Sequence, residues 1–188
     1  MARIEVPETL AGATVRLRAL AERDAPAYAA AFREDPDLGR LLGLPSDPDE
    51  RWAQEHTRRC SEAAERGEWV ELAIRDPDTD DFLGVVMLLR LDWQSRRSEL
   101  GYWLTLRSRR KGLASGAVAL ALDWAFTGLD LLRIEIATTV ENVPSQKLAR
   151  RHGFTEEALQ RARDVERGRR IDVIQFGLLR EEYLTAAD

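Results

Sequence analysis

A short stretch in the second half of the chain, Arg107 to Gly116, constrains the fold more than any other feature. It reads R-S-R-R-K-G-L-A-S-G, so basic residues are followed by small ones, and an apolar, alanine-rich run comes directly after it. Small residues let the main chain approach a ligand closely, and the free N–H groups in the first turn of a helix bind anions. The stretch therefore predicts an anion-binding turn that leads into a helix.

The composition places the chain among globular proteins and excludes several classes. Its 188 residues are 44% hydrophobic and 32% charged, and we expect a single domain spanning residues 1–188. A net charge of −5 argues against nucleic-acid binding as the main role. No apolar run approaches the roughly 20 residues that cross a bilayer, and the N-terminus shows no signal-peptide core. We therefore expect a cytoplasmic protein without membrane contact, and the lone Cys60 excludes an internal disulfide.

Hydrophobic periodicity and turn residues predict alternating strands and helices. Strands are expected at residues 15–20, 69–75, 82–91, 98–105, 131–138, 154–159 and 171–179. Helices are expected from Asp24 as N-cap to 32, from 50 to 66, from 113 to a stop at Gly128, and from 144 to 152. Segments 35–49 and 161–170 are expected to be loops. This order predicts one mixed α/β domain.

Other phosphate-binding motifs do not fit the basic turn. A P-loop requires G-x-x-x-x-G-K followed by Ser or Thr, and Gly112 has no such partner. A dinucleotide fingerprint requires G-x-G-x-x-G after the first strand, whereas this turn follows the fourth strand of the main run and has another spacing. What remains is the pattern Arg-x-x-Gly-x-Ala at Arg109, Gly112 and Ala114.

This pattern resembles the pyrophosphate loop of the GNAT superfamily of acyl-CoA-dependent N-acyltransferases, Gln/Arg-x-x-Gly-x-Gly/Ala. The upstream E-L-G-Y-W-L at 99–104 and the downstream Thr138, Asn142 and Ser145 are similar to the branch of ribosomal-protein N-terminal (alanine/serine) acetyltransferases. The opening strand and helix and the L-L-R-E-E-Y tail extend the resemblance over nearly the whole chain. It implies an α/β (α+β) single-domain GNAT fold, in which a mixed central sheet with two splayed parallel strands is flanked by helices.

The resemblance also implies where an acyl-CoA would bind. Its pantetheine arm would lie between the splayed strands 98–105 and 131–138, and its pyrophosphate would rest on the N–H groups of residues 110–115. The implied acetyl-CoA residues are Leu104, Thr105, Leu106, Arg109, Arg110, Lys111, Gly112, Leu113, Ala114, Ser115, Asn142 and Ser145, and no metal is implied. The basic residues could instead be a solvated helix start, and Asn142 could equally be a helix cap.

Transfer of an acetyl group from a thioester to an amine requires a base for the amine and a proton donor for the thiolate. Many superfamily members use a tyrosine in the helix before the Gly-Phe pair, and here that position is Ala149. Ser145 remains as the candidate donor, or else as an early-helix hydroxyl. Glu99 is the candidate base, acting through water, or else a structural carboxylate paired with an arginine. His56 is expected to be exposed, and His152 is expected to complement a helix dipole.

The acceptor follows from the absence of an obvious strong base. An α-amino group has a pKa of about 7.7–8.0 and a lysine side chain one of about 10.4, so an α-amine fits such a site better. We expect an acetyl-CoA-dependent N-acetyltransferase for a protein or peptide N-terminus. The alternatives are a small amine or antibiotic as acceptor, a longer acyl-CoA as donor, or a non-catalytic acyl-CoA sensor. Segments 35–49 and 161–170 are expected to select the acceptor, and a homodimer stays open.

Overall fold

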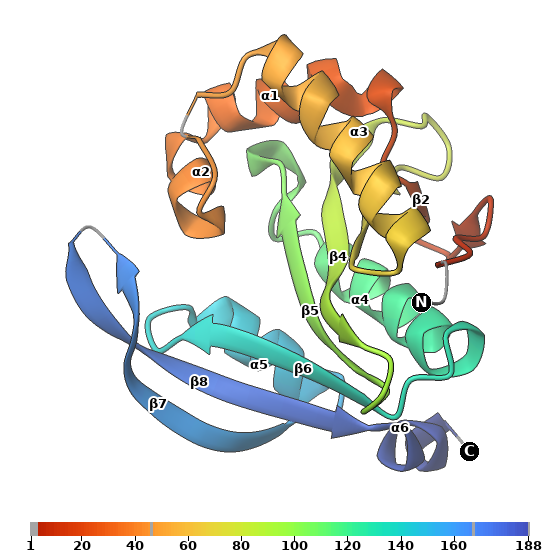
Figure 1. Ribbon diagram of the computed structural model, residues 1–188, viewed down its shortest axis with the longest axis vertical. Helices are drawn as coiled ribbons and strands as arrows, with labels where there is room; N and C mark the ends of the chain where they lie inside the picture. The colour runs from red at the N-terminus through yellow and green to blue at the C-terminus, as the bar shows by residue number, and fades with distance from the viewer. Residues whose placement is uncertain (1–3, 46, 167, 188) are drawn as a thin grey trace.

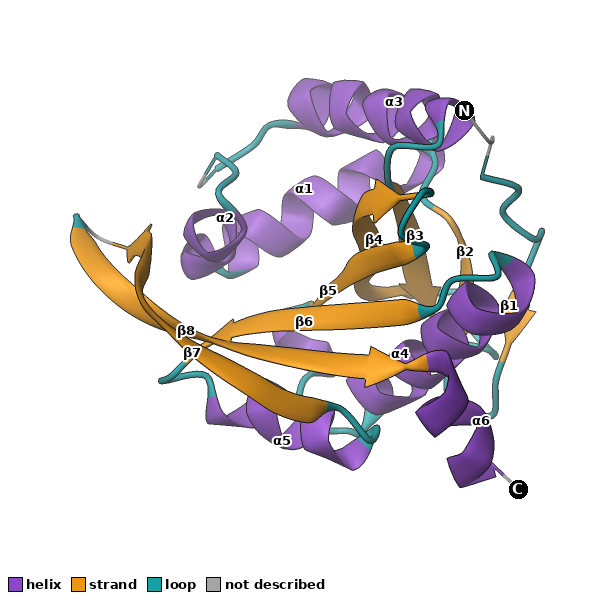
Figure 2. Cartoon of the chain, turned by 60° about the horizontal axis from the view of Figure 1, so that its bottom comes forward, coloured by secondary structure: helices purple, strands orange, loops and turns teal. Residues whose placement is uncertain are grey.

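The computed structural model describes residues 4–45, 47–166 and 168–187. Eight strands form one sheet in the order β1-β2-β3-β4-β5-β6-β8-β7, with helices on both of its faces (Figures 1 and 2). The strands are β1 (Leu10–Ala11), β2 (Arg16–Ala19), β3 (Val70–Arg75), β4 (Phe82–Asp92), β5 (Arg97–Leu104), β6 (Arg133–Thr139), β7 (Thr155–Glu166) and β8 (Arg169–Leu179). The helices are α1 (Ala25–Glu34), α2 (Pro36–Leu42), α3 (Glu50–Arg66), α4 (Leu113–Asp123), α5 (Val143–Arg151) and α6 (Arg180–Ala187).

The parallel pair β5–β6 is where the sheet opens. These strands are paired only where residues 97–99 meet residues 133–135, and every other neighbouring pair in the sheet is antiparallel. Beyond Glu99, β5 stays paired with β4 as far as Leu104, and β6 stays paired with β8 as far as Thr139. The two strands therefore diverge toward their carboxyl ends, as Figure 1 shows, and the predicted splay is confirmed.

Each face of the sheet has its own buried cluster, because successive side chains of a strand point to opposite faces. On one face, Leu72, Val86 and Leu100 pack with Val118 and Leu122 of α4. The other face packs Ala73, Val85 and Trp103 against α1 and α3, where Tyr28 and Phe32 are fully buried. Truncating a buried aromatic side chain such as Phe32 to alanine would cost about 3–5 kcal/mol of stability. This second layer holds the helices α1 and α3 on the face opposite α4.

Several local predictions are confirmed with small shifts. Helix α3 runs from Glu50 to Arg66, where Asp49 accepts a hydrogen bond from the Trp52 N–H and Gly67 ends the helix with φ of 71°. Helix α4 passes at Asp123 into a π-helical turn that ends at Gly128.

Three predictions made from the sequence are wrong, and a fourth, the cap of α1, is confirmed only in part. Segment 35–49 is not a continuous loop, because α2 occupies 36–42. Segment 161–170 is mostly strand, because β7 continues to Glu166 and β8 starts at Arg169, and Arg167 lies outside the described residues. Asp24 is the N-cap residue of α1 as predicted, but its side chain does not cap the helix, since its buried carboxylate binds Arg18 at 2.6 Å and Arg75 at 3.2 Å. His56 is buried, because α3 packs it against Tyr28 and Glu71.

Candidate active site

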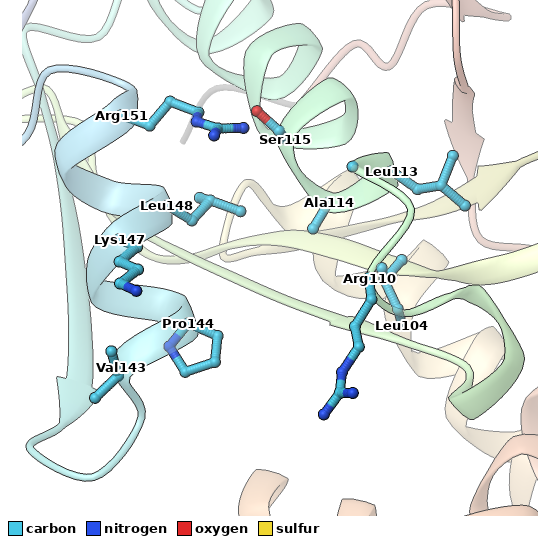
Figure 3. Close-up of a pocket in the computed structure, with 11 residues that line it drawn as sticks. Leu104, Arg110, Leu113, Ala114, Ser115, Val143, Pro144, Lys147, Leu148 and Arg151 are labelled. Atoms are coloured by element: carbon cyan, nitrogen blue, oxygen red, sulfur yellow. The ribbon is translucent and has the colours of Figure 1, made fainter.

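A pocket of about 360 Å³ lies between the N-terminal part of α4, the length of α5 and the end of β5 (Figure 3). Six of the predicted acetyl-CoA residues line it, and they are Leu104, Arg110, Gly112, Leu113, Ala114 and Ser115. The turn predicted to bind an anion therefore opens onto a cavity. The other predicted residues surround the pocket without lining it, and they are Thr105, Leu106, Arg109, Lys111, Asn142 and Ser145.

The turn before α4 has the backbone geometry that its sequence predicts. Gly112 is the N-cap of α4 and has φ of 78°, a left-handed conformation that glycine adopts without steric cost. A Cβ placed there would meet no atom within 4 Å, so the space beside the glycine is open in the protein. Arg110 also has a positive φ, 63°, which is uncommon outside glycine. Together these residues set the first turn of α4 beside the pocket, and within this turn the Ser115 N–H donates to the Gly112 carbonyl at 3.0 Å.

The pocket carries two cations that the sequence analysis missed. Lys147 and Arg151 lie one turn apart on α5, on the side that faces α4, and Figure 3 shows the guanidinium of Arg151 directed toward Ser115. With Arg110 they place positive charge on both walls, which favours an anionic ligand. Their spacing of four residues on a predicted helix was the signal that could have found them.

Ser145 lies at the N-terminal end of α5 and is buried. Asn142 caps this helix by accepting a hydrogen bond from the Ser145 N–H at 3.2 Å, so the capping role of Asn142 is confirmed. Tyr102 of β5, a residue that the sequence analysis did not select, is hydrogen-bonded to Ser145. Burial raises the pKa of Tyr102, and the contact with Ser145 partly opposes that effect. The phenol is therefore a neutral O–H group, two residues before the pocket residue Leu104.

Glu99 is the last residue of β5 that pairs with β6, and the two strands splay apart beyond it. Its carboxylate accepts a hydrogen bond from Arg90 at 2.5 Å and lies 4.0 Å from the guanidinium of Arg163 on β7. The side chain keeps 19% of its surface exposed. Glu99 thus has arginine partners, as the structural alternative predicts, and remains accessible to water.

Arg109 begins the basic motif, yet it is turned toward the protein. Its Nε donates to the Leu104 carbonyl at 3.2 Å, and its guanidinium also binds the carboxylate of Asp35. Thr105 is buried and bonded to Ser108 at 2.6 Å, whereas Leu106 and Lys111 are exposed. These contacts brace the segment between β5 and α4.

His152 follows α5 and contacts the pocket through Ser115. Its Nε2 lies 2.9 Å from the Ser115 hydroxyl. Burial, together with the nearby Arg151, lowers the pKa of His152, which favours the neutral ring. The prediction that a charged His152 complements a helix dipole is therefore not supported, and the ring instead orients a hydroxyl in the pocket wall.

A second group of reactive side chains lies on the other face of the sheet. His56, Cys60 and Glu71 are buried and bring possible metal-ligand atoms within 4.8 Å of one another. His56 already contacts the Tyr28 hydroxyl at 3.2 Å and Glu71 at 3.3 Å, and burial, with the Glu71 charge, raises the pKa of the Cys60 thiol. These contacts make the cluster a hydrogen-bonded part of the core.

Within the described residues, no helix is both long and apolar enough to cross a membrane.

The structure thus combines a pocket with basic walls at the N-terminus of α4 with a parallel strand pair that splays apart. The acetyltransferase (GNAT) domain family matches residues 14–155, so the chain belongs to this family and is an N-acetyltransferase. Members of the family use acetyl-CoA as the acetyl donor. The expected GNAT family, fold class and enzyme class are therefore confirmed, and the ribosomal-protein branch stays a prediction.

Relatives and solved structures agree on the fold and differ in their acceptors. The chain is 32% identical over 176 residues to "Uncharacterized N-acetyltransferase p20" of Bacillus licheniformis, covering 94% of this chain and 98% of that one. A solved structure of RimL, a ribosomal L7/L12 α-N-protein acetyltransferase in complex with coenzyme A, aligns with a TM-score of 0.85, 21% identity and coverage of 92% and 98%. Spermidine N-acetyltransferase of Vibrio cholerae, in complex with CoA and spermine, aligns with a TM-score of 0.81, 22% identity and coverage of 92% and 99%.

Proposed function

We propose that the chain transfers an acetyl group from acetyl-CoA to the N-terminal α-amine of a protein or peptide, as in the ribosomal-protein branch of the family. The pocket between α4 and α5 would hold the donor. Its pyrophosphate would rest on the N–H groups of Leu113 and Ala114, with Arg110 and Arg151 balancing its charge. The pantetheine arm would pass Leu104 and enter the splay between β5 and β6.

The chemistry at the inner end of this path would use Glu99 and Ser145. The amine nitrogen forms a bond to the thioester carbonyl carbon while the carbon–sulfur bond breaks. The proton lost by the nitrogen passes through water to Glu99, and the departing sulfur receives a proton from the Ser145 hydroxyl, which is replenished by the hydrogen-bonded Tyr102. A neutral phenol suits this task, because burial keeps the Tyr102 proton in place at neutral pH.

The acceptor proposal rests on the arginine partners of the acidic side chains near the splay. Glu99 is paired with Arg90, Glu135 with Arg133 at 2.9 Å, and Glu166 with Arg40. A polyamine carries several positive charges and is best recognised by carboxylates that lack such partners. Paired carboxylates offer less attraction to a polycation, whereas a single α-amine needs only one base. This pairing favours a peptide N-terminus over a polyamine.

The test is thiol release from acetyl-CoA with matched acceptors. A peptide beginning with serine or alanine, the same peptide with a blocked N-terminus, and spermidine would be compared at equal ionic strength. We expect kcat/KM to be at least about tenfold higher for the free peptide than for spermidine, a difference of about 1.4 kcal/mol, and no release with the blocked peptide. Preference for spermidine would overturn the acceptor proposal. Binding of acetyl-CoA without release to any amine would instead indicate a sensor.

A further inference from the structure

Arg109 links two parts of the protein that are distant in sequence. It belongs to the segment that joins β5 to α4, and it binds Asp35, a residue 74 positions earlier at the junction of α1 and α2. The Asp35 side chain keeps 12% of its surface exposed, so the pair is shielded from water on the Asp35 side. Shielding reduces the screening that makes fully exposed ion pairs weak.

Asp35 combines three structural roles. Its N–H donates to Ala31 at 3.0 Å and ends α1, and its carbonyl accepts the Leu38 N–H at 3.0 Å where α2 begins. Its Oδ1 accepts the Asp37 N–H at 3.2 Å, and its Oδ2 binds Arg109. One carboxylate therefore caps α2 and also fixes that cap against the segment before α4.

The other contact of Arg109 is at the end of β5. The N–H of Thr105 donates to the Leu83 carbonyl on β4 at 2.9 Å. The C=O and N–H of one trans peptide group point in opposite directions, so the Leu104 carbonyl points away from β4, toward the splay. Arg109 binds this carbonyl, and the Leu104 side chain lines the pocket. The same guanidinium thus holds the pocket edge and Asp35.

Helix α2 depends on such polar anchors for its position. It has seven residues, and only Leu38 and Gly39 are buried. Its other anchor is the ion pair between Arg40 and Glu166 at the far end of β7, and Figure 1 shows α2 and this end of the hairpin on the same side of the molecule. A short helix with little buried apolar surface belongs to the part of a protein that opens most easily.

From these contacts we infer that Asp35 is a positioning residue, which acts through Arg109 to couple donor binding to the placement of α2. The inference rests on the proposed function, in which the donor settles beside Leu104 and on the start of α4. Ordering that segment holds Arg109, Arg109 holds Asp35, and Asp35 fixes the start of α2. When the donor is bound, helices α1 and α2 are thereby placed relative to the thioester of acetyl-CoA.

The test is hydrogen exchange of residues 36–42 with and without saturating CoA, in wild type, Asp35→Asn and Arg109→Gln. Asparagine retains the capping oxygen and removes the charge, so α2 can still form. Glu34→Gln is the matched control, because it removes an exposed carboxylate next to Asp35. We expect CoA to slow exchange in this segment about threefold or more in wild type and in Glu34→Gln, an effect typical of a local opening equilibrium that a ligand shifts. We expect no slowing in the other two variants.

A double-mutant cycle of kinetic measurements is the second test. Asp35→Asn and Arg109→Gln should each lower kcat/KM for the acceptor about tenfold, and the double variant should be no worse than either, because the two act as a unit. Additive losses, or slowing of exchange that persists in Asp35→Asn, would overturn the inference. If wild type binds CoA but hydrogen exchange in residues 36–42 is not slowed, the inference about Asp35 is overturned, whereas the proposed function is not. Wild type that fails to bind CoA, as measured by calorimetry, would overturn both.

Discussion

The donor side and the acceptor side of this protein are built in different ways. The proposed donor pocket is formed by two local segments, the stretch from Leu104 to Ser115 and the helix α5, whose lining residues include Lys147 and Arg151. The proposed acceptor side comprises α1, α2 and the long hairpin β7–β8. Ion pairs between distant residues, such as Arg40 with Glu166, join these elements.

This difference implies that the two sides respond to substitution in different ways. In the proposed function the donor is held by backbone N–H groups and a helix terminus, which depend on a few local conformations. The acceptor side depends on side-chain pairs across long loops, and such contacts can be exchanged without disturbing the sheet. We therefore expect variants on one side to alter the kinetics of one substrate only, with Asp35 and Arg109 as the exceptions.

The largest expected effect is on the acceptor side, at Glu99. Glu99→Gln removes the proposed base and should lower kcat by about 100-fold at pH 6.5, the lower range for general-base catalysis. The loss should be smaller at pH 9, because an α-amine with a pKa near 8 is then largely neutral. Steady-state kinetics across this pH range checks it.

Arg90→Ala is the matched control for Glu99, because it removes the arginine partner and leaves the carboxylate. If Arg90→Ala lowers kcat as much as Glu99→Gln does, or if the loss in Glu99→Gln is the same at every pH, Glu99 serves the ion pair and is not the base.

The next effect concerns the donor side, at Gly112. Gly112→Val places a branched side chain in the open space where the pyrophosphate would lie, at a φ that valine rarely adopts. The loss of one charge-assisted hydrogen bond, about 2 kcal/mol, corresponds to about thirtyfold weaker acetyl-CoA binding. Calorimetric titration measures it.

Gly168→Val controls for the backbone strain. Gly168 also has a positive φ, 71°, a Cβ added there would meet no atom within 4 Å, and the residue lies outside the pocket. Equal acetyl-CoA affinity in Gly112→Val and wild type would contradict the pyrophosphate site.

A smaller effect is expected at Arg163. Its guanidinium donates to Gln175 at 3.1 Å and approaches Glu99, so it should orient the acceptor without touching the donor. Arg163→Ala should raise the acceptor KM about fivefold, the range of a partly exposed ion pair, with unchanged acetyl-CoA affinity. Arg161→Ala, an exposed arginine on the same strand, should change neither. A fall in acetyl-CoA affinity in Arg163→Ala would contradict the assignment of Arg163 to the acceptor side alone.

The smallest effect is a pH dependence at His152. The pKa of this ring is lowered in the folded protein, chiefly by burial, so the unfolded chain binds the proton more tightly. As pH falls through the unfolded value of about 6.5 and toward the folded value, wild type should lose stability. Because the ring is partly exposed, the loss should stay below about 1 kcal/mol. His152→Gln should lose less between pH 7.5 and 5 in thermal unfolding, and equal losses would contradict the lowered pKa.

The donor side could largely be predicted from the sequence, because its determinants are local. Gly112 with its basic neighbours indicates an anion-binding turn, and the spacing of Lys147 and Arg151 was also readable. The pairing of Arg109 with Asp35 could not be predicted, since the two residues lie 74 positions apart in the sequence. Only the folded chain brings such a pair together.

The acceptor side was predicted poorly for two physical reasons. Helix α2 has seven residues and includes Pro36 and Gly39, so it is too short for a periodic pattern to stand out. The edge strand β7 is solvated along most of its length, so its charged residues lack the alternation that marks a half-buried strand and resemble a loop. Tyr102 belongs to the E-L-G-Y-W-L segment that the sequence analysis singled out. Its contact with Ser145 could not be predicted, because it forms only when the chain folds and the strands splay apart.

The central claim, acetyl transfer from CoA to an α-amine, is tested most directly by competition within one molecule. A peptide with a free N-terminus and an internal lysine would be incubated with the protein and acetyl-CoA at pH 7, and the acetylated position would be assigned by tandem mass spectrometry. We expect acetylation of the α-amine, because its pKa is about 2–3 units below that of lysine. Acetylation of the lysine side chain, or of neither amine while spermidine is modified, would contradict it.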